Sequence, residues 1–299
     1  DHPNGDVPYS TISTIAESPL DFNQIWVGTD DGNIQLTRDG GSSWTNVTGS
    51  IQKDLWVSEV HASVHEKGTA YVSLNGYRFD DFDTYLYKTT DFGKTWKSVK
   101  GNLPNEVANV IVQDPVVPSI LYAGLDHGTY ISFNDGNEWH YLNQVPNVAS
   151  YDMVVHPREY ELVIGTHGRS IWVMDVKPLH KLSERMNERV TGFSPDDIRH
   201  SGRWGSQFSP YRDPFNPSVD LMYFISNKKG DSVEITVKDK EGDKIFSTKQ
   251  SSEYGFNIFE WDLVIDTDSD GKKTYIQKGE YTIEFKVGKS THTTSFNVK

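Results

Sequence analysis

The 299-residue sequence contains no cysteine, so it offers neither a disulfide framework nor a thiolate that could bind a metal or attack a substrate. It also lacks any run near the ~20 apolar residues that a membrane-spanning helix needs. No positively charged segment followed by an apolar stretch opens the sequence, so it shows no signal peptide. Its first residues resemble the interior of a longer protein or a processed start.

Basic residues are scarce, with 29 Lys and Arg against 42 Asp and Glu, giving a formal net charge of −13. Phosphate-rich ligands need basic patches, so this balance argues against nucleic acid and anionic membrane surfaces as main partners. Only 35% of the residues are hydrophobic, yet 12% are aromatic, and there are 24 Gly and 13 Pro. This composition favours an all-β fold of short strands joined by polar turns.

One phrase recurs along the first half of the sequence. Residues 25–32 return as 121–128, as 162–168 and more loosely as 70–76, with the matching Gly or Ser at positions 28, 73, 124 and 165. An alternating segment precedes each copy, at residues 11–16, 57–64, 107–112 and 151–155. A period of ~40–50 residues that holds four short strands is typical of a β-propeller blade.

A tighter motif follows the first three copies. Residues 37–44 and 89–96 have the form Ser/Thr-x-Asp-x-Gly-x-x-Trp, and residues 132–139 repeat it with Asn134 in place of Asp. The Asp or Asn side chain accepts backbone N–H bonds in a tight turn, Gly supplies a positive φ, and Trp packs between blades. We expect the motif between the third and fourth strands of each blade.

This motif resembles the Asp-box (BNR) repeat of sialidases, xyloglucanases and sortilin-type receptors. In that repeat the motif lies at the blade periphery, which implies a structural role for Asp39, Asp91 and Asn134. The fourth unit, over residues 161–175, lacks the motif. Three full blades and a partial one do not close a seven- or eight-bladed ring, so the remaining blades, from the same or another chain, are expected partners.

We predict blades over residues 1–176, a strap over 177–217 with a short helix at 195–200, and an immunoglobulin-like sandwich over 218–299. Trp261-Asp262 followed by Gly279-Glu280-Tyr281 resembles the immunoglobulin-like domain of the flagellar hook-capping type. The whole order resembles the C-terminal end of secreted bacterial sortilin-like propeller proteins, which are often called glycosyl hydrolases. This resemblance implies a secreted, periplasmic or cell-surface location in a bacterium.

The loops between the second and third strands of the blades are expected to share one rim of the propeller. Polar and titratable groups from separate repeats meet there, which makes the rim the default ligand site. The candidates are Asp30, Asp31, Tyr77, Arg78, Asp80, Asp81, Asp126, His127, His167 and Arg169. An ordinary solvated acidic rim is the alternative for each of them.

Three functions remain open from the sequence. A module that binds peptide, protein or glycan without catalysis is the first, an Asp-box glycoside hydrolase that shares its site with other blades the second, and a structural cell-surface component the third. Hydrolysis needs a carboxylate pair of which one has a raised pKa, and the rim aspartates do not single out a pair. A sialidase would need an arginine cluster, and only Arg78 and Arg169 reach the rim.

A possible calcium site is the one cofactor that the sequence suggests. Asp266, Asp268 and Asp270 precede Gly271 in the Asp-x-Asp-x-Asp-Gly pattern that opens a calcium loop, with oxygens at alternating positions. The twelfth position, where a bidentate Glu is expected, holds Gln277. The alternative is a solvated hairpin loop rich in turn residues.

Overall fold

The computed structural model of the protein describes residues 10–51, 54–207, 211 and 214–299. The chain divides into two compact units, with the boundary along the sequence between His180 and Lys181. Nearly all of the regular structure is β, as the sequence predicts; the described residues add one α-helix, α1 (Lys177–Ser183), and one 3-10 turn, η1 (Tyr77–Phe79). None of the helices in this described part has the length and apolar character to span a membrane.

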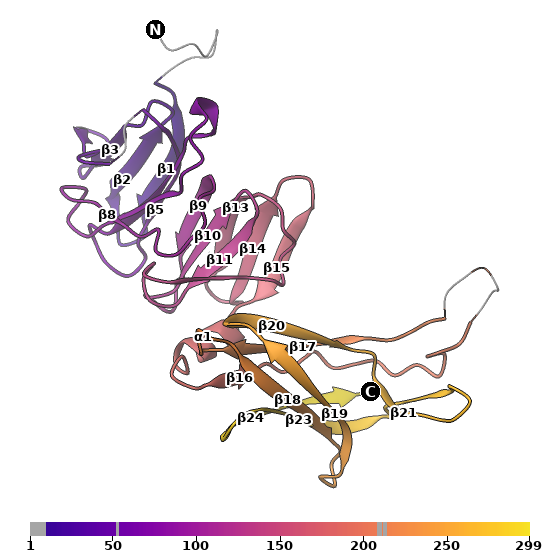
Figure 1. The fold of residues 1–299 in the computed structure, drawn as a ribbon. Helices are drawn as coiled ribbons and strands as arrows, with labels where there is room; N and C mark the ends of the chain where they lie inside the picture. Colours follow the sequence, from indigo (N-terminus) through magenta and orange to yellow (C-terminus); the bar gives the residue numbers. More distant parts are fainter. Residues whose placement is uncertain (1–9, 52–53, 208–210, 212–213) are drawn as a thin grey trace. The chain divides into compact units, whose positions relative to one another are not determined.

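The first unit consists of four antiparallel sheets, each built from strands that follow one another in the chain (Figure 1). The first sheet contains β1 (Ile12–Ser18), β2 (Asp21–Thr29), β3 (Ile34–Thr37) and β4 (Thr45–Asn46). The second contains β5 (Trp56–Ala62), β6 (Ala70–Asn75), β7 (Tyr85–Thr89) and β8 (Lys97–Ser98). The third contains β9 (Ala108–Gln113), β10 (Leu121–Leu125), β11 (Gly128–Ser132) and β12 (Trp139–Tyr141). The fourth has β13 (Ser150–His156), β14 (Glu161–Thr166) and β15 (Ile171–Asp175). The predicted three blades and one partial blade are therefore confirmed.

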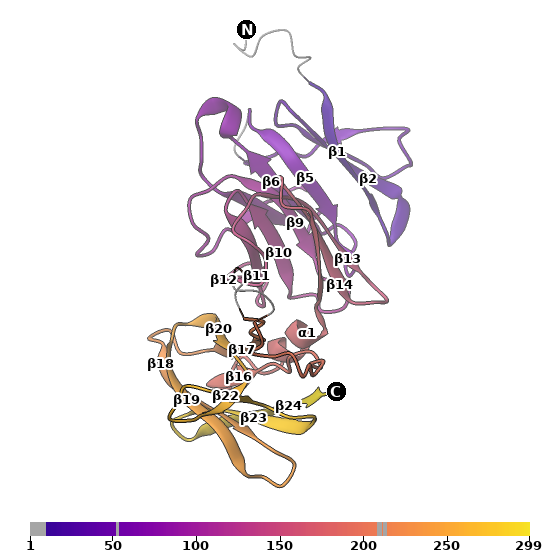
Figure 2. The same cartoon turned by 90° about the vertical axis from the view of Figure 1, so that its right-hand side faces the viewer.

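Successive blades pack through apolar residues on their facing sides. Figure 2 shows β5, β6, β9 and β10 side by side, and the first strands of neighbouring blades contact each other in turn. Trp26 and Ile34 of the first blade share a core with Val57 of the second, while Tyr71 of the second shares a core with Ile111 of the third. Among the described strands, no ladder of hydrogen bonds joins the first blade to the fourth.

The repeated motif forms the same turn three times. The Asp39 carboxylate accepts hydrogen bonds from Ser43 N at 2.8 Å and Ser43 Oγ at 2.6 Å, and Asp91 does the same with Thr95 at 2.9 and 2.7 Å. Asn134 accepts the corresponding bond from Glu138 N at 2.8 Å. Hydrogen bonds from the side chain and backbone of Ser43 hold the pKa of Asp39 down at about 2. These side chains close turns, which is the structural role expected of them.

The motif also ties each blade to the one before it. Trp96 Nε1 donates to the Val47 carbonyl at 2.8 Å, and Trp139 Nε1 donates to the Val99 carbonyl at 2.9 Å. Gly136 has a φ of +79°, and a Cβ there would lie 2.6 Å from Val99 Cβ. The glycine is thus required by both the turn and the close approach of the neighbouring blade.

Each blade's first strand carries a β-bulge, one residue that has no partner on the second strand. The bulged residues are Ser13, Ser58, Asn109 and Tyr151. Two of them bridge blades directly, since Ser13 Oγ donates to the Val57 carbonyl at 2.7 Å and Ser58 Oγ to the Ala108 carbonyl at 3.2 Å. These two bulges therefore join the first strands of consecutive blades.

The second unit is a two-sheet β-sandwich with a small additional hairpin. One sheet has the order β16 (Val190–Gly192), β17 (Val219–Ile225), β20 (Gly255–Trp261), and the other β19 (Lys244–Ser252), β18 (Asp231–Lys238), β23 (Gly279–Val287), β24 (Ser290–Val298). The hairpin pairs β21 (Val264–Thr267) with β22 (Lys273–Tyr275). Both sheets contribute to one core, which contains Tyr223, Trp261 and Phe285.

The predicted helix at residues 195–200 is wrong. This segment is extended: Ile198 N donates to the Asn297 carbonyl, and Asp197 accepts a bond from Asn297 N. The edge of β24 offers these residues backbone partners, which a short helix would forgo. The α-helix forms earlier, over Lys177–Ser183, where the Asp175 carboxylate accepts a bond from Lys177 N.

Candidate functional site

On the first blade, the two predicted rim aspartates hold the loop between β2 and β3. Asp30 Oδ1 accepts a hydrogen bond from Thr11 N at 2.8 Å. Asp31 accepts bonds from Thr29 Oγ1 and Ser10 Oγ. Partial burial raises the pKa of Asp31, but these hydrogen bonds outweigh burial, so its pKa is lowered overall. Both carboxylates are thus committed to backbone and hydroxyl partners within their own blade.

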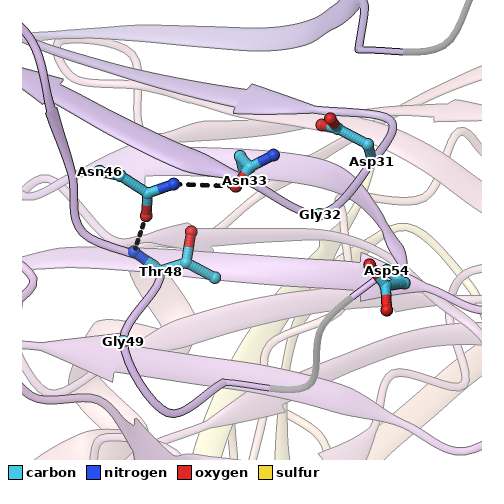
Figure 3. A pocket seen from close by; sticks show the side chains of 7 residues that line it. All are labelled: Asp31, Gly32, Asn33, Asn46, Thr48, Gly49 and Asp54. Atoms are coloured by element: carbon cyan, nitrogen blue, oxygen red, sulfur yellow. Dashed lines mark hydrogen bonds between the residues drawn. The ribbon is translucent and has the colours of Figure 1, made fainter.

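A polar pocket of about 230 Å³ lies beside this loop (Figure 3). It is lined by Asp31, Gly32, Asn33, Asn46, Thr48, Gly49 and Asp54. Asn46 Nδ2 donates to Asn33 Oδ1 at 2.8 Å, and Thr48 N donates to Asn46 Oδ1 at 3.0 Å. The side-chain amides of Asn33 and Asn46 therefore bond the loop before β3 to the end of β4. Asp54 adds a second carboxylate to the pocket.

On the second blade, the long loop after β6 presents an exposed aromatic pair. Tyr77 begins η1 and packs edge-on against Phe82, with 6.1 Å between ring centroids. Asp81 fixes the loop by accepting bonds from the Tyr85 hydroxyl and from Asp83 N, and the Arg78 guanidinium lies 5.1 Å from the Trp56 ring. Asp80, the left-handed residue that ends η1, is exposed.

A chain of buried amides connects this loop to the third blade. Asn75 Oδ1 accepts a bond from Tyr77 N, and Asn75 Nδ2 donates to Asn109 Oδ1 at 3.1 Å. Asn109 Nδ2 in turn donates to Asp126 Oδ1 at 3.0 Å. Because Asn75 and Asn109 are both buried, this chain fixes Asp126 relative to the Tyr77 loop.

The fourth blade adds a second exposed aromatic at the same place. Tyr151, the bulged residue of β13, packs edge-on against His167 with 5.6 Å between ring centroids. Partial burial raises the pKa of Tyr151, and the nearby Asp126 and Tyr77 raise it further. Tyr77, Asp126, Tyr151 and His167 thus come together from three blades, and we refer to these four residues as the rim cluster.

The other two rim candidates are engaged with their own neighbours. His127 N donates to Glu106 Oε2 at 3.1 Å, and His127 Nδ1 lies 3.3 Å from the same oxygen. Arg169 accepts a bond from Trp172 Nε1 at 2.9 Å only through its backbone carbonyl, and the residue is exposed. Sequence reasoning missed Tyr151, Asn75 and Asn109, because nothing in the sequence marks the bulge that turns position 151 toward the rim or the pairing of the two amides.

Sequence reasoning also missed a pair of carboxyl groups on the first strands. Glu59 of β5 directly follows the bulged Ser58, and Asp152 of β13 directly follows the bulged Tyr151. Burial raises the pKa of Glu59 to about 7, and the Asp152 charge contributes to the rise. A carboxyl group with a pKa near 7 is suited to donate a proton as a general acid.

The three aspartates of the suggested calcium loop lie in the hairpin of β21 and β22. Asp268 Oδ1 accepts bonds from Asp270 N at 3.0 Å and Lys272 N at 2.8 Å, and Asp266 Oδ1 accepts one from Thr267 N. Over the described ranges, no group of three His, Asp or Glu side chains converges in a way that could hold a metal ion. Calcium binding and a solvated loop remain the two alternatives for this hairpin.

No protein-family model matches the chain. A 90-residue segment, 29% of this chain, is 28% identical to the oligoxyloglucan-reducing end-specific xyloglucanase of Emericella nidulans and 30% identical to a probable one from Neosartorya fischeri; it spans 10% of each relative. The GH74 xyloglucanase structure from Xanthomonas campestris aligns with 96% of this chain and 45% of its own length, at a TM-score of 0.48 and 14% identity. The blade architecture itself places the chain among propeller-type proteins.

Proposed function

We propose that the first unit is a glycan-binding module and that its ligand contacts the rim cluster. The observation that carries this proposal is the gathering of Tyr77, Asp126 and Tyr151 from three different blades. Exposed aromatic faces stack on the apolar faces of sugar rings, and a fixed carboxylate accepts sugar hydroxyl bonds, which is the usual composition of a small polar ligand site. The names of the curated relatives, both xyloglucanases, support a xyloglucan-type oligosaccharide as the ligand.

The proposal includes the finer classification suggested by the motifs. The three closed turns support their assignment as Asp boxes in a sortilin-like propeller protein, and the two-sheet sandwich of the second unit supports an immunoglobulin-like domain. A glycan ligand is in keeping with a secreted or cell-surface location in a bacterium. Peptide or protein binding and a purely structural role are the alternatives against which the binding experiment is set.

The experiment is a titration of the 299-residue chain with xyloglucan oligosaccharides by calorimetry. We expect Tyr151→Ala and Tyr77→Ala each to weaken binding at least tenfold, because each removes a stacking surface. Phe215→Ala is the matched control, since Phe215 is an exposed aromatic of the second unit, and it should leave the affinity unchanged. Unchanged affinity in Tyr151→Ala, or binding of peptides but no glycan on a mixed array, would contradict the proposal.

Glycoside hydrolysis is the second candidate, and the raised pKa of Glu59 favours it. Glu59 would act as the proton donor and Asp152 as the second carboxyl group, in a site completed by further blades. Incubation of the chain with xyloglucan oligosaccharides and assay of new reducing ends tests this. Release that Glu59→Gln lowers at least 100-fold would support hydrolysis, whereas binding without release supports the non-catalytic module.

A further inference from the structure

The outer face of the first blade, on the side away from the second blade, is unusually apolar and exposed. Ile15 lies two positions after the bulge of its first strand, and Val60, Ile111 and Met153 occupy the equivalent positions in the later blades. Ile15 is 66% exposed, against 1%, 0% and 4% for Val60, Ile111 and Met153. Ile12 is 61% exposed, although its counterparts before the bulge in the other blades are all buried. In the later blades, the preceding blade covers these positions.

The tryptophan of the repeated motif also differs between the first blade and the later blades. Trp96 and Trp139 each donate to the carbonyl of the residue that follows the fourth strand of the preceding blade, Val47 and Val99. Trp44 occupies the equivalent position in the first blade, and it is 45% exposed where Trp139 is 3% exposed. The motif glycines show the same difference. A Cβ at Gly136 would lie 2.6 Å from Val99 of the preceding blade, whereas the nearest atom to a Cβ at Gly41 belongs to Trp44 of the same blade, at 3.9 Å.

We propose that the face formed by Ile12, Ile15 and Trp44 seats one further four-stranded blade of the same repeat type, supplied by polypeptide outside residues 1–299. In this arrangement Trp44 Nε1 donates to the backbone carbonyl of the residue after the fourth strand of that blade. The two internal junctions supply the geometry, because Trp96 and Trp139 make this same bond. The inference is independent of the proposed ligand.

A second copy of this chain fits the face less well. The occupant must present a carbonyl just after a fourth strand, and the first two blades already give theirs to Trp96 and Trp139. In the third blade the corresponding residue, Leu142, is fully buried, and its carbonyl already accepts a bond from Val145 N at 3.1 Å. The fourth blade exposes Ile171 and Val173, but its described sheet ends at the third strand, β15. A complete blade that does not belong to residues 1–299 meets the requirement.

The experiment uses an extended chain in which a copy of residues 54–106, the second blade with its linker, is joined to Thr11. This joint keeps the register, because Asp30 N donates to the Thr11 carbonyl as Asp126 N donates to the Val107 carbonyl. We expect the Trp44 indole N–H, followed by NMR hydrogen exchange, to exchange at least tenfold more slowly in the extended chain than in the 299-residue chain. The Trp96 and Trp139 indoles are internal references for protection.

Matched variants give a second measurement. In the 299-residue chain Trp96→Phe should lower the melting temperature by several degrees and Trp44→Phe should not; in the extended chain both should lower it. The proposal is overturned if, in the extended chain, the Trp44 indole N–H exchanges as fast as in the 299-residue chain and Trp44→Phe leaves the melting temperature unchanged. So does a 299-residue chain that dimerises in sedimentation equilibrium with its Trp44 indole protected, since the occupant would then be a second copy.

Discussion

The two units build β-sheets in opposite ways. Every sheet of the first unit pairs strands in chain order, so each blade is complete within a short stretch of sequence. In the second unit β17 pairs with β20, and β18 pairs with both β19 and β23, so the sheets depend on strands far apart in the chain. Because the strands of a blade are neighbours in the chain, a motif of eight residues is enough to mark a blade in the sequence. In the second unit the strand pairing depends instead on the side chains that the two sheets bury in their shared core.

The two kinds of core differ accordingly. The first unit has separate apolar clusters between blades, interleaved with polar groups such as the buried Asn75 and Asn109. The second unit has one aromatic core, in which Trp261 stacks on Phe246 with 4.7 Å between ring centroids. Damage to a blade should therefore stay at a junction, and damage to the sandwich should affect the whole unit.

The largest expected effect is that of Trp261→Ala. Removal of this fully buried ring should cost about 3–5 kcal/mol and lower the melting transition of the second unit, while the transition of the first unit stays in place. Differential scanning calorimetry of the full chain measures both transitions. Phe215→Ala, at an exposed site of the same unit, is the control. A single transition that moves as a whole would break the contrast between the units.

The next effect concerns Glu59 and depends on pH. Burial raises its pKa in the folded state to about 7, above the ordinary value of 4.5, so the folded state binds the proton more tightly and stability falls as pH rises from about 4.5 through 7. Glu59→Gln should abolish this loss and stabilise the first unit by about 2–3 kcal/mol at pH 8, with little change at pH 4. Denaturant unfolding at the two pH values measures it.

The exposed Glu260 of the second unit provides the matched control for this measurement. Glu260→Gln should leave the pH dependence of the first unit as it is in the parent chain. Parallel stability curves for the parent and Glu59→Gln would show that Glu59 does not have a raised pKa in the folded state.

A smaller effect is expected for Asn134→Ala in the third motif. The variant loses the acceptor of the Glu138 N–H bond at 2.8 Å and of the Ser132 hydroxyl at 3.1 Å, so the first unit should be destabilised by about 1 kcal/mol. Urea unfolding measures the change. Asn134→Asp, which restores the residue of the other two motifs, should keep stability near that of the parent. A loss in Asn134→Asp as large as in Asn134→Ala would contradict the turn-closing role.

The smallest effect is expected from calcium. Asp268 already accepts two backbone N–H bonds of the hairpin between β21 and β22, which favours the solvated-loop alternative. Millimolar calcium should therefore leave the melting temperature of the second unit unchanged, and Asp268→Asn should not alter that result. A calcium-dependent rise that Asp268→Asn removes would instead establish the cation site.

The blades could be predicted because their specification is local. Gly93, Asp91 and Trp96 lie within one turn, and each contacts residues only a few positions away or in the preceding blade. The second unit's alternating strands were visible in the sequence, but the pairing of β16 and the extended path of Ile198 along β24 were not, since both are decided by backbone partners more than 30 residues away.

The rim was predicted in part. The loops that bear Tyr77, Asp126 and His167 do meet, as the blade repeat implies. The repeat does not reveal that Asp30, Asp31 and Asp81 are committed to hydrogen bonds, because such bonds depend on the path of each loop. It also hides Tyr151 and Glu59, whose places are set by a single inserted residue in a strand.

That inserted residue has a consequence for how such a protein can change over evolutionary time. The bulged position is occupied by Ser13, Ser58, Asn109 and Tyr151 in the four blades, a range from a small hydroxyl to a large ring. The residues on either side keep the register of the first strand with the second, so four different side chains are held in the same strand pairing. Repeat duplication followed by substitution at this one site would change the side chains presented between blades while the pairing of the strands stays constant.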